Sequence, residues 1–186
     1  MTLQQTPMAK EFSAIMRYQM ADSDWVHQWA WSSIRELDTL MRILHAKDDY
    51  TARHCQQVCD LSIRLGSHLQ LTSRELERTA LAALYHDVGK VGITGQVLNK
   101  PANLTTHEWR AIRTHPIIGE ELVCSLCPGE RMPAIIQQHH EAWNGQGYPN
   151  GLAGDDILLE ARILHICDVY DALVSDRPYR SAYSQR

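Results

Sequence analysis

The chemistry of this chain is carried by five histidines and two aspartates, which lie between positions 54 and 168. They are His54, His86, Asp87, His115, His139, His140 and Asp168. A neutral imidazole nitrogen binds divalent transition metals well, and a carboxylate can bridge two of them. An adjacent His-Asp pair suits the shared wall of a binuclear site, so the pattern predicts a two-metal hydrolytic centre in which Asp87 is the bridging ligand.

Such a centre needs two cations roughly 3.5–4 Å apart, which polarise a phosphoryl oxygen and generate a bridging hydroxide at neutral pH. That hydroxide is the expected nucleophile, so the reaction needs no serine or cysteine nucleophile. The sequence contains neither a Walker-type phosphate loop nor a dinucleotide-binding fingerprint, which would favour other nucleotide chemistry.

The elements that must position these residues are helices. His86 and Asp87 follow the apolar run 81–85 and precede Gly89, so they are expected where a buried helix ends. His139 and His140 follow the apolar segment 133–136 and precede the glycine-rich loop 144–151, so they should also stand at a helix end.

Hydrophobic periodicity predicts helices throughout the chain and therefore an all-α fold. Ile34, Leu37, Met41 and Leu44 indicate an N-terminal amphipathic helix. Helix starts are expected at Thr72/Ser73 and at Thr105, where Thr105 and Glu108 fit a capping box. The predicted helices span about 23–46, 50–69, 73–86, 105–115, 116–126, 133–140 and 157–175.

Composition narrows the class of protein. A chain of 186 residues with 44% hydrophobic and 22% charged residues has room for one well-packed domain. No apolar run approaches the about 20 residues that cross a bilayer, so membrane insertion is not expected. A net charge of −4 gives no electrostatic support for binding duplex nucleic acid. Five cysteines and no signal peptide indicate a cytoplasmic protein.

Taken in order, the motifs resemble those of HD-GYP phosphodiesterases, a subfamily of the HD metal-dependent phosphohydrolases. The first motif is His86-Asp87-Val88-Gly89-Lys90, and the second runs from His139 to Pro149 and contains Gly147-Tyr148-Pro149. Further matching segments are 50–54, 97–105, 115–119, 168–173 and 176–180. The resemblance covers about residues 48 to 183 and implies a compact helical bundle with the binuclear metal site in its core. It divides the chain into an N-terminal helical extension (1–47) and an HD-GYP domain (48–186), which is expected to lack the family's usual C-terminal helices.

The resemblance assigns roles to individual residues. One metal ion is expected on His54, His86, Asp87 and Asp168, and the other on Asp87, His115, His139 and His140. Asp87 and Lys90 are the expected catalytic residues. The expected substrate-binding residues are Lys90, Tyr148, Arg177 and Arg180. The ammonium group of Lys90 and the guanidinium groups of the two arginines can bind phosphate oxygens. The implied cofactors are two divalent ions, iron or manganese, since the ligands are nitrogen and oxygen without thiolate.

The implied substrate is cyclic di-GMP, which the family opens to linear pGpG and in some members cuts further to GMP; cyclic GMP-AMP is a second candidate. The implied protein partner is a diguanylate cyclase domain, bound through the loop that bears Gly147-Tyr148-Pro149. Apart from the resemblance, a second copy of the chain is a candidate partner, bound through a face formed by Trp25, Trp29 and Trp31. Members with three metals carry a glutamate four residues before the first ligand histidine. Tyr50 stands there in this chain, so a binuclear centre is predicted.

Two other functions stay open: a catalytically weak cyclic-dinucleotide-binding or interaction module, and a general HD phosphohydrolase acting on nucleotides. Several individual residues are expected to have structural roles or have more than one candidate role. His27, His45, His68, His107 and His165 are expected to be surface or hydrogen-bonded groups. Lys100 fits a phosphate contact or a solvated charge equally well. For Glu141 we favour support of a ligand histidine over general acid or loop anchor. Trp25, Trp29 and Trp31 are expected to cover the core.

Overall fold

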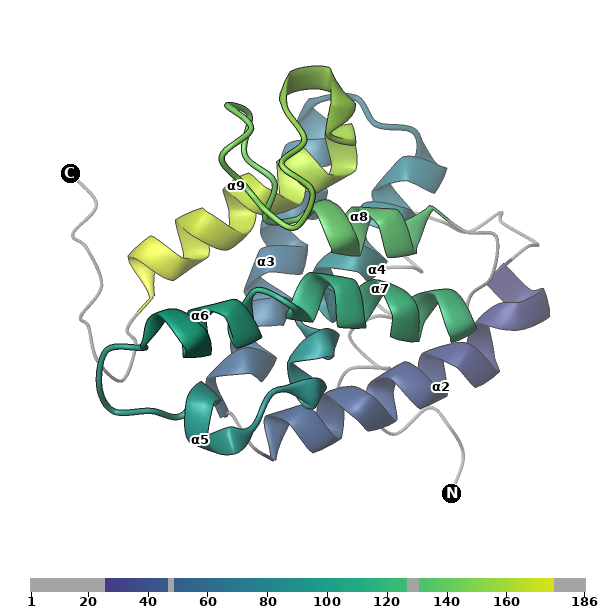
Figure 1. The fold of residues 1–186 in the computed structure, drawn as a ribbon. Helices are drawn as coiled ribbons and strands as arrows, with labels where there is room; N and C mark the ends of the chain where they lie inside the picture. The colour runs from purple at the N-terminus through teal and green to yellow at the C-terminus, as the bar shows by residue number, and fades with distance from the viewer. Residues whose placement is uncertain (1–25, 47–48, 127–130, 176–186) are drawn as a thin grey trace.

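The computed structural model describes residues 26–46, 49–126 and 131–175 (Figure 1), and for residues 26–34, 49, 50 and 52 it describes the backbone alone. Within these ranges the fold is helical, with a single antiparallel bridge between Asn144 and Ala153 and no β-strand. The all-α prediction is therefore confirmed. No helix of the described ranges is both long enough and apolar enough to cross a bilayer.

The longer helices follow the predicted order along the chain. They are α2 (Val26–His45), α3 (Asp49–His68), α4 (Ser73–Tyr85), α6 (Thr106–Ile112), α7 (His115–Leu126), α8 (Met132–Gln138) and α9 (Leu159–Val174). Three short elements were not predicted: the 3₁₀ helices η2 (Val88–Gly92) and η3 (Gly154–Asp156), and the single turn α5 (Gly95–Leu98).

Two helices begin at capping boxes. Thr72 accepts a hydrogen bond from the Glu75 amide, and the Glu75 carboxylate accepts one from the Thr72 amide at 2.8 Å. Thr105 and Glu108 make the same reciprocal pair at the start of α6, as the sequence predicted. These boxes satisfy amide groups that the first turn of a helix leaves without partners.

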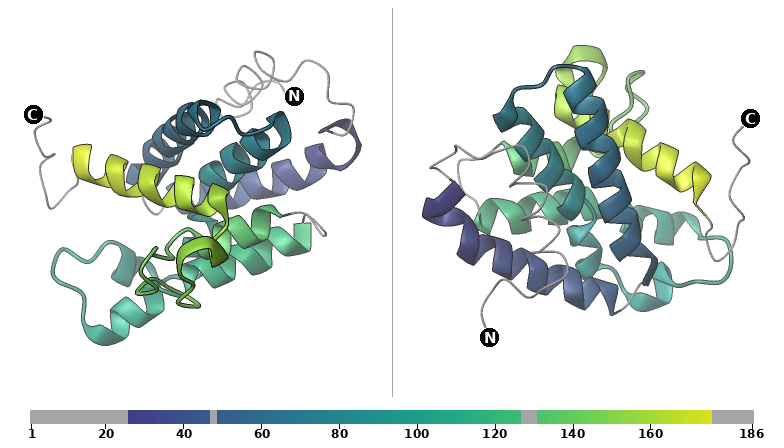
Figure 2. Two further views of the ribbon diagram at one scale, coloured as in Figure 1. Left: turned by 90° about the horizontal axis from the view of Figure 1, so that it is seen from above. Right: turned by 180° about the vertical axis from the view of Figure 1, so that it is seen from behind.

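The core forms where the helices cross. α3 packs against α4 and α9, while α7 packs against α8 and η2, and α4 also contacts α8 (Figure 2). The amphipathic helix α2 lies against η2, α3 and α7. Its Leu37, Met41 and Leu44 are buried in the same core as the motif-bearing helices. The division of the chain at residue 47 stays a prediction.

Gly89 allows η2 to lie directly on the first turn of α7. A Cβ atom at this position would collide with the His115 carbonyl oxygen and would lie 2.5 Å from the Gly119 amide nitrogen. Both neighbours are backbone atoms that cannot turn aside. The glycine of the first motif therefore sets the distance between Asp87, which precedes η2, and His115, which begins α7.

Candidate metal centre

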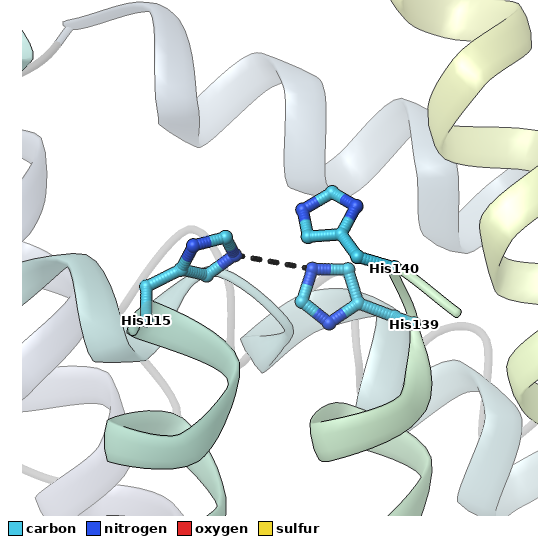
Figure 3. Close-up of side chains that lie close together, drawn as sticks. All are labelled: His115, His139 and His140. Atoms are coloured by element: carbon cyan, nitrogen blue, oxygen red, sulfur yellow. Dashed lines mark hydrogen bonds between the residues drawn. The ribbon is translucent and has the colours of Figure 1, made fainter. Parts of the chain in front are cut away.

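The structure brings together all seven predicted ligands from five helical elements. His54 lies in α3, His86 and Asp87 directly follow α4, His115 begins α7, His139 and His140 follow α8, and Asp168 lies in α9. Two groups have all their ligand atoms within 4.8 Å of one another: His54 with His86 and Asp87, and His115 with His139 and His140. Figure 3 shows the second group, whose rings converge from α7 and from the end of α8.

Three of the imidazoles are oriented by the backbone. The Nδ1 atoms of His86, His115 and His139 lie 2.8, 2.8 and 2.6 Å from the carbonyl oxygens of Ala83, Ile112 and Ile136, each three residues earlier. A carbonyl oxygen only accepts, so Nδ1 must carry the proton. In the neutral ring Nε2 then has a free lone pair, which is the form that binds a metal.

Burial keeps the second group neutral. It lowers the pKa of His115 to about 4 and that of His140 to about 3, and it holds the pKa of His139 well below its usual range. The Nε2 atoms of His115 and His139 nevertheless lie 3.2 Å apart (Figure 3). With both protons on Nδ1, two lone pairs face each other, an arrangement that a divalent cation would stabilise. The donor set therefore fits a metal ion.

Asp87 lies between the two groups. One carboxylate oxygen, Oδ1, is 3.5 Å from His115 Nε2, and the other, Oδ2, is 3.5 Å from His86 Nε2. Burial would raise the pKa of this carboxyl, but Lys90 and the neighbouring histidines hold it well below its usual value. Lys90 Nζ donates to Oδ2 at 2.6 Å. Asp87 thus presents an ionised oxygen to each group, as a bridging ligand must.

His54 is held by two carboxylates of α9. Its Nε2 lies 3.0 Å from Asp168 Oδ1, and its Nδ1 lies 2.6 Å from Asp171 Oδ2. Burial would lower the pKa of His54, but these hydrogen bonds raise it to about 9. Ser175 Oγ donates to the other Asp171 oxygen at 3.0 Å. No role was predicted for Asp171, although its place one helical turn after Asp168 puts both carboxylates on the same side of α9.

One edge of the centre faces solvent. The side chains of Asp168, His140 and Lys90 are 13%, 21% and 24% exposed, whereas the other four ligand histidines are at most 4% exposed. The Tyr148 ring extends this edge, with its centroid 4.7 Å from that of His140. Arg113 lies over Tyr148 in turn, its guanidinium carbon 5.1 Å from the ring centroid. No role was predicted for Arg113.

The favoured role for Glu141, support of a ligand histidine, is wrong. The buried carboxylate instead accepts three backbone hydrogen bonds, from Asn150 at 2.6 Å, Gly151 at 3.1 Å and Leu152 at 3.0 Å. Glu141 is therefore the anchor of the Gly-Tyr-Pro loop. A Cβ atom on Gly147 would collide with the Ala142 amide, so this glycine lets the loop pass over the residue that follows Glu141.

The structure also assigns ordinary roles. Lys100 donates to both Glu108 oxygens, at 2.9 and 2.7 Å, which favours a structural ion pair over a phosphate contact. His165 Nδ1 donates to the His139 carbonyl at 2.8 Å, as expected of a hydrogen-bonded histidine. Other predictions fall outside the described residues or side chains: Arg177 and Arg180, the side chain of Tyr50, and the tryptophans at 25, 29 and 31.

Comparison with known proteins gives consistent results. A family model described as an HD domain matches residues 38–186. The cyclic di-GMP phosphodiesterase PA4108 of Pseudomonas aeruginosa is 37% identical over 165 residues, which cover 87% of this chain and 40% of that protein. The response regulator RpfG of Xanthomonas campestris, a cyclic di-GMP phosphodiesterase, is 39% identical over 81% of this chain and 41% of its own length. The 3'3'-cGAMP-specific phosphodiesterase 3 of Vibrio cholerae is 37% identical over 76% of this chain and 31% of its own.

These relatives are longer proteins, and the chain spans about a third to two fifths of their length. Among solved structures, Bd1817, a HDG"Y"P protein from Bdellovibrio bacteriovorus, matches with a TM-score of 0.56 and 24% identity, over 77% of this chain and 50% of that one. At this identity the match supports the fold.

Proposed function

Because the chain belongs to the HD domain family, we propose that it is a metal-dependent phosphodiesterase that hydrolyses cyclic di-GMP to linear pGpG. The observation that carries this proposal is the placement of Asp87, which offers one ionised oxygen to each of two histidine groups. The names of the relatives supply the substrate class, cyclic dinucleotides, and cyclic GMP-AMP is the second candidate within it.

We propose that the centre is binuclear. His54, His86 and Asp168 would hold one cation, His115, His139 and His140 the other, and Asp87 both. When bound, two divalent cations would polarise the phosphoryl oxygen and supply a hydroxide nucleophile at neutral pH. Iron and manganese are the proposed ions, because imidazole and carboxylate ligands without thiolate suit both.

The residues at the open edge would handle the phosphate. Burial lowers the pKa of Lys90, but Asp87 raises it more, so the ammonium stays charged at neutral pH. It lies next to the bridging carboxylate, where it can offset the negative charge of the phosphodiester being cleaved. Tyr148 would form one wall of the substrate site through its contact with His140. Arg177 and Arg180 stay proposed phosphate contacts on the strength of the resemblance.

We also propose a protein partner and a cellular location. The Trp143 side chain is 62% exposed on the Gly-Tyr-Pro loop, which offers a surface for a diguanylate cyclase domain. A cytoplasmic location agrees with the free thiols of Cys55 and Cys59, which lie one helical turn apart. Homodimerisation stays a prediction.

The test is to load the protein with Fe(II) or Mn(II), add cyclic di-GMP or cyclic GMP-AMP, and identify the products by chromatography. We expect linear pGpG to accumulate, with GMP slow or absent, and Asp87→Ala to abolish the reaction. Asp155→Ala, which changes a surface carboxylate 90% exposed, is the matched control. Binding of cyclic di-GMP without any linear product would favour a binding module, and turnover of mononucleotides alone would favour a general phosphohydrolase.

A further inference from the structure

Arg113 lies at the outer end of a row of stacked groups that begins in the metal centre. The His140 ring contacts the Tyr148 ring at a centroid distance of 4.7 Å, and the Arg113 guanidinium carbon lies 5.1 Å from the centroid of the same tyrosine. A cation over an aromatic face is attracted by the ring electrons, which limits the conformations of a long side chain. Tyr148 therefore holds a positive charge in a defined place beside the exposed edge of the centre.

Among the described residues, no carboxylate pairs with the charge of Arg113. Within the described ranges Arg113 makes no ion pair, although several other cations do: Lys90 pairs with Asp87, Lys100 with Glu108 and Arg162 with Asp155. Arg113 is exposed, and a contact to a ring face leaves the N–H donors of the guanidinium free. A fixed guanidinium with free donors is suited to a phosphate, which it can bind through two oxygens at once.

We propose that Arg113 binds the second phosphodiester of the cyclic dinucleotide, the one that is not being hydrolysed. This inference rests on the proposed function. A cyclic dinucleotide carries two phosphates on opposite sides of its sugar–phosphate ring. The cleaved phosphate belongs at the metal ligands and Lys90, so the other needs a cation displaced from the centre but on its open side. Arg113 meets this condition, since one aromatic ring separates it from His140.

The experiment compares two substrates of the metal-loaded protein. Cyclic di-GMP has two phosphates, whereas bis(p-nitrophenyl) phosphate is a diester with only one. For Arg113→Ala we expect KM for cyclic di-GMP to rise about tenfold, as for the loss of one charge-assisted hydrogen bond. The ratio of kcat/KM for cyclic di-GMP to kcat/KM for the small diester should fall by a similar factor. Arg113→Lys keeps the charge and should recover part of the loss.

Arg110→Ala is the control, because it removes an exposed arginine from α6, the helix that Arg113 directly follows, and should leave this ratio as in wild type. Ionic strength gives a second readout. Salt screens an exposed charge pair, so KM for cyclic di-GMP should rise more steeply with salt in wild type than in Arg113→Ala.

Two results would overturn the inference. An unchanged KM for cyclic di-GMP in Arg113→Ala would show that Arg113 does not bind the second phosphate. Equal losses on both substrates would show that Arg113 acts by holding Tyr148 and His140 in place. Failure of the proposed function looks different: wild type would cleave the small diester but neither cyclic dinucleotide, whatever residue stands at position 113.

Discussion

The Nε2 atoms of His115 and His139 lie 3.2 Å apart although each ring has its Nδ1 bonded to a backbone carbonyl three residues earlier. Burial lowers the pKa of both rings, so a bridging proton is not available near neutral pH. In the described part of the chain, the fold thus holds two nitrogen lone pairs 3.2 Å apart with no proton between them. A bound cation would turn this repulsive contact into a stabilising one.

Removal of metal should therefore destabilise the protein. A ligand that binds only the folded state adds about 2.7 kcal/mol at a hundred times its Kd. We expect Mn(II) to raise the Tm of chelator-treated protein by several degrees, measured by scanning calorimetry. In Asp87→Ala this rise should largely disappear. An equal Tm with chelator and with excess Mn(II) would argue against a metal site in the core.

Metal binding should release a proton from His54. Hydrogen bonds to Asp168 and Asp171 raise the pKa of His54 to about 9 in the metal-free protein, so the ring is protonated at pH 7. His115 and His140, with pKa values of about 4 and 3, are already neutral. Since a ligand nitrogen must be unprotonated, metal affinity should rise about tenfold per pH unit between pH 6.5 and 9. Titration calorimetry in buffers of different ionisation enthalpy would count the proton.

In the metal-free protein, the raised pKa of His54 makes the stability of the fold decrease as the pH rises, whereas metal affinity increases. The stability that protonated His54 contributes is fully present below its unfolded pKa of 6.5 and is lost as the pH rises through about 9.

Asp171→Asn tests the source of the released proton, because it keeps the shape of the His54 partner but removes its charge. It should reduce proton release at pH 7 and weaken metal binding about 10- to 100-fold. Full proton release in this variant would show that Asp171 is not needed to keep His54 protonated at pH 7.

Glu141→Gln should loosen the Gly-Tyr-Pro loop without removing the metals. The buried carboxylate accepts three backbone hydrogen bonds, and its charge strengthens each of them. An amide has one acceptor oxygen, so we expect a loss of about 1.5–3 kcal/mol and faster hydrogen exchange over residues 143–156. Glu121→Gln, at an exposed position of α7, is the matched control. Unchanged loop exchange in Glu141→Gln would contradict the role of this residue as the loop anchor.

Much of the fold could be predicted, because its determinants are local. The capping boxes at Thr72 and Thr105 and the apolar spacing of Leu37, Met41 and Leu44 depend on neighbours within a few residues. The short elements η2 and α5 carry too few residues for a periodic signal. The close approach of η2 and α7 at Gly89 was also not predictable, since it depends on contact between segments distant in sequence.

The candidate site shows the same division. The residue types of the seven ligands indicate metal binding, and the motifs that contain them follow the order that the resemblance expects along the chain. Their surroundings depend on tertiary contacts: Asp171 meets His54 from another helix, and Glu141 turns toward backbone amides nine to eleven residues later. No sequence pattern predicted a role for Arg113, because an exposed arginine near a helix end is common. Only the position of Tyr148 beneath it indicates a function.

Anomalous diffraction from crystals of the metal-loaded protein would test the central claim most directly. We predict two peaks, one among His54, His86 and Asp168 and one among His115, His139 and His140, with one Asp87 oxygen facing each. A single peak would contradict the bridging role of Asp87. Three peaks would contradict the binuclear centre predicted from Tyr50.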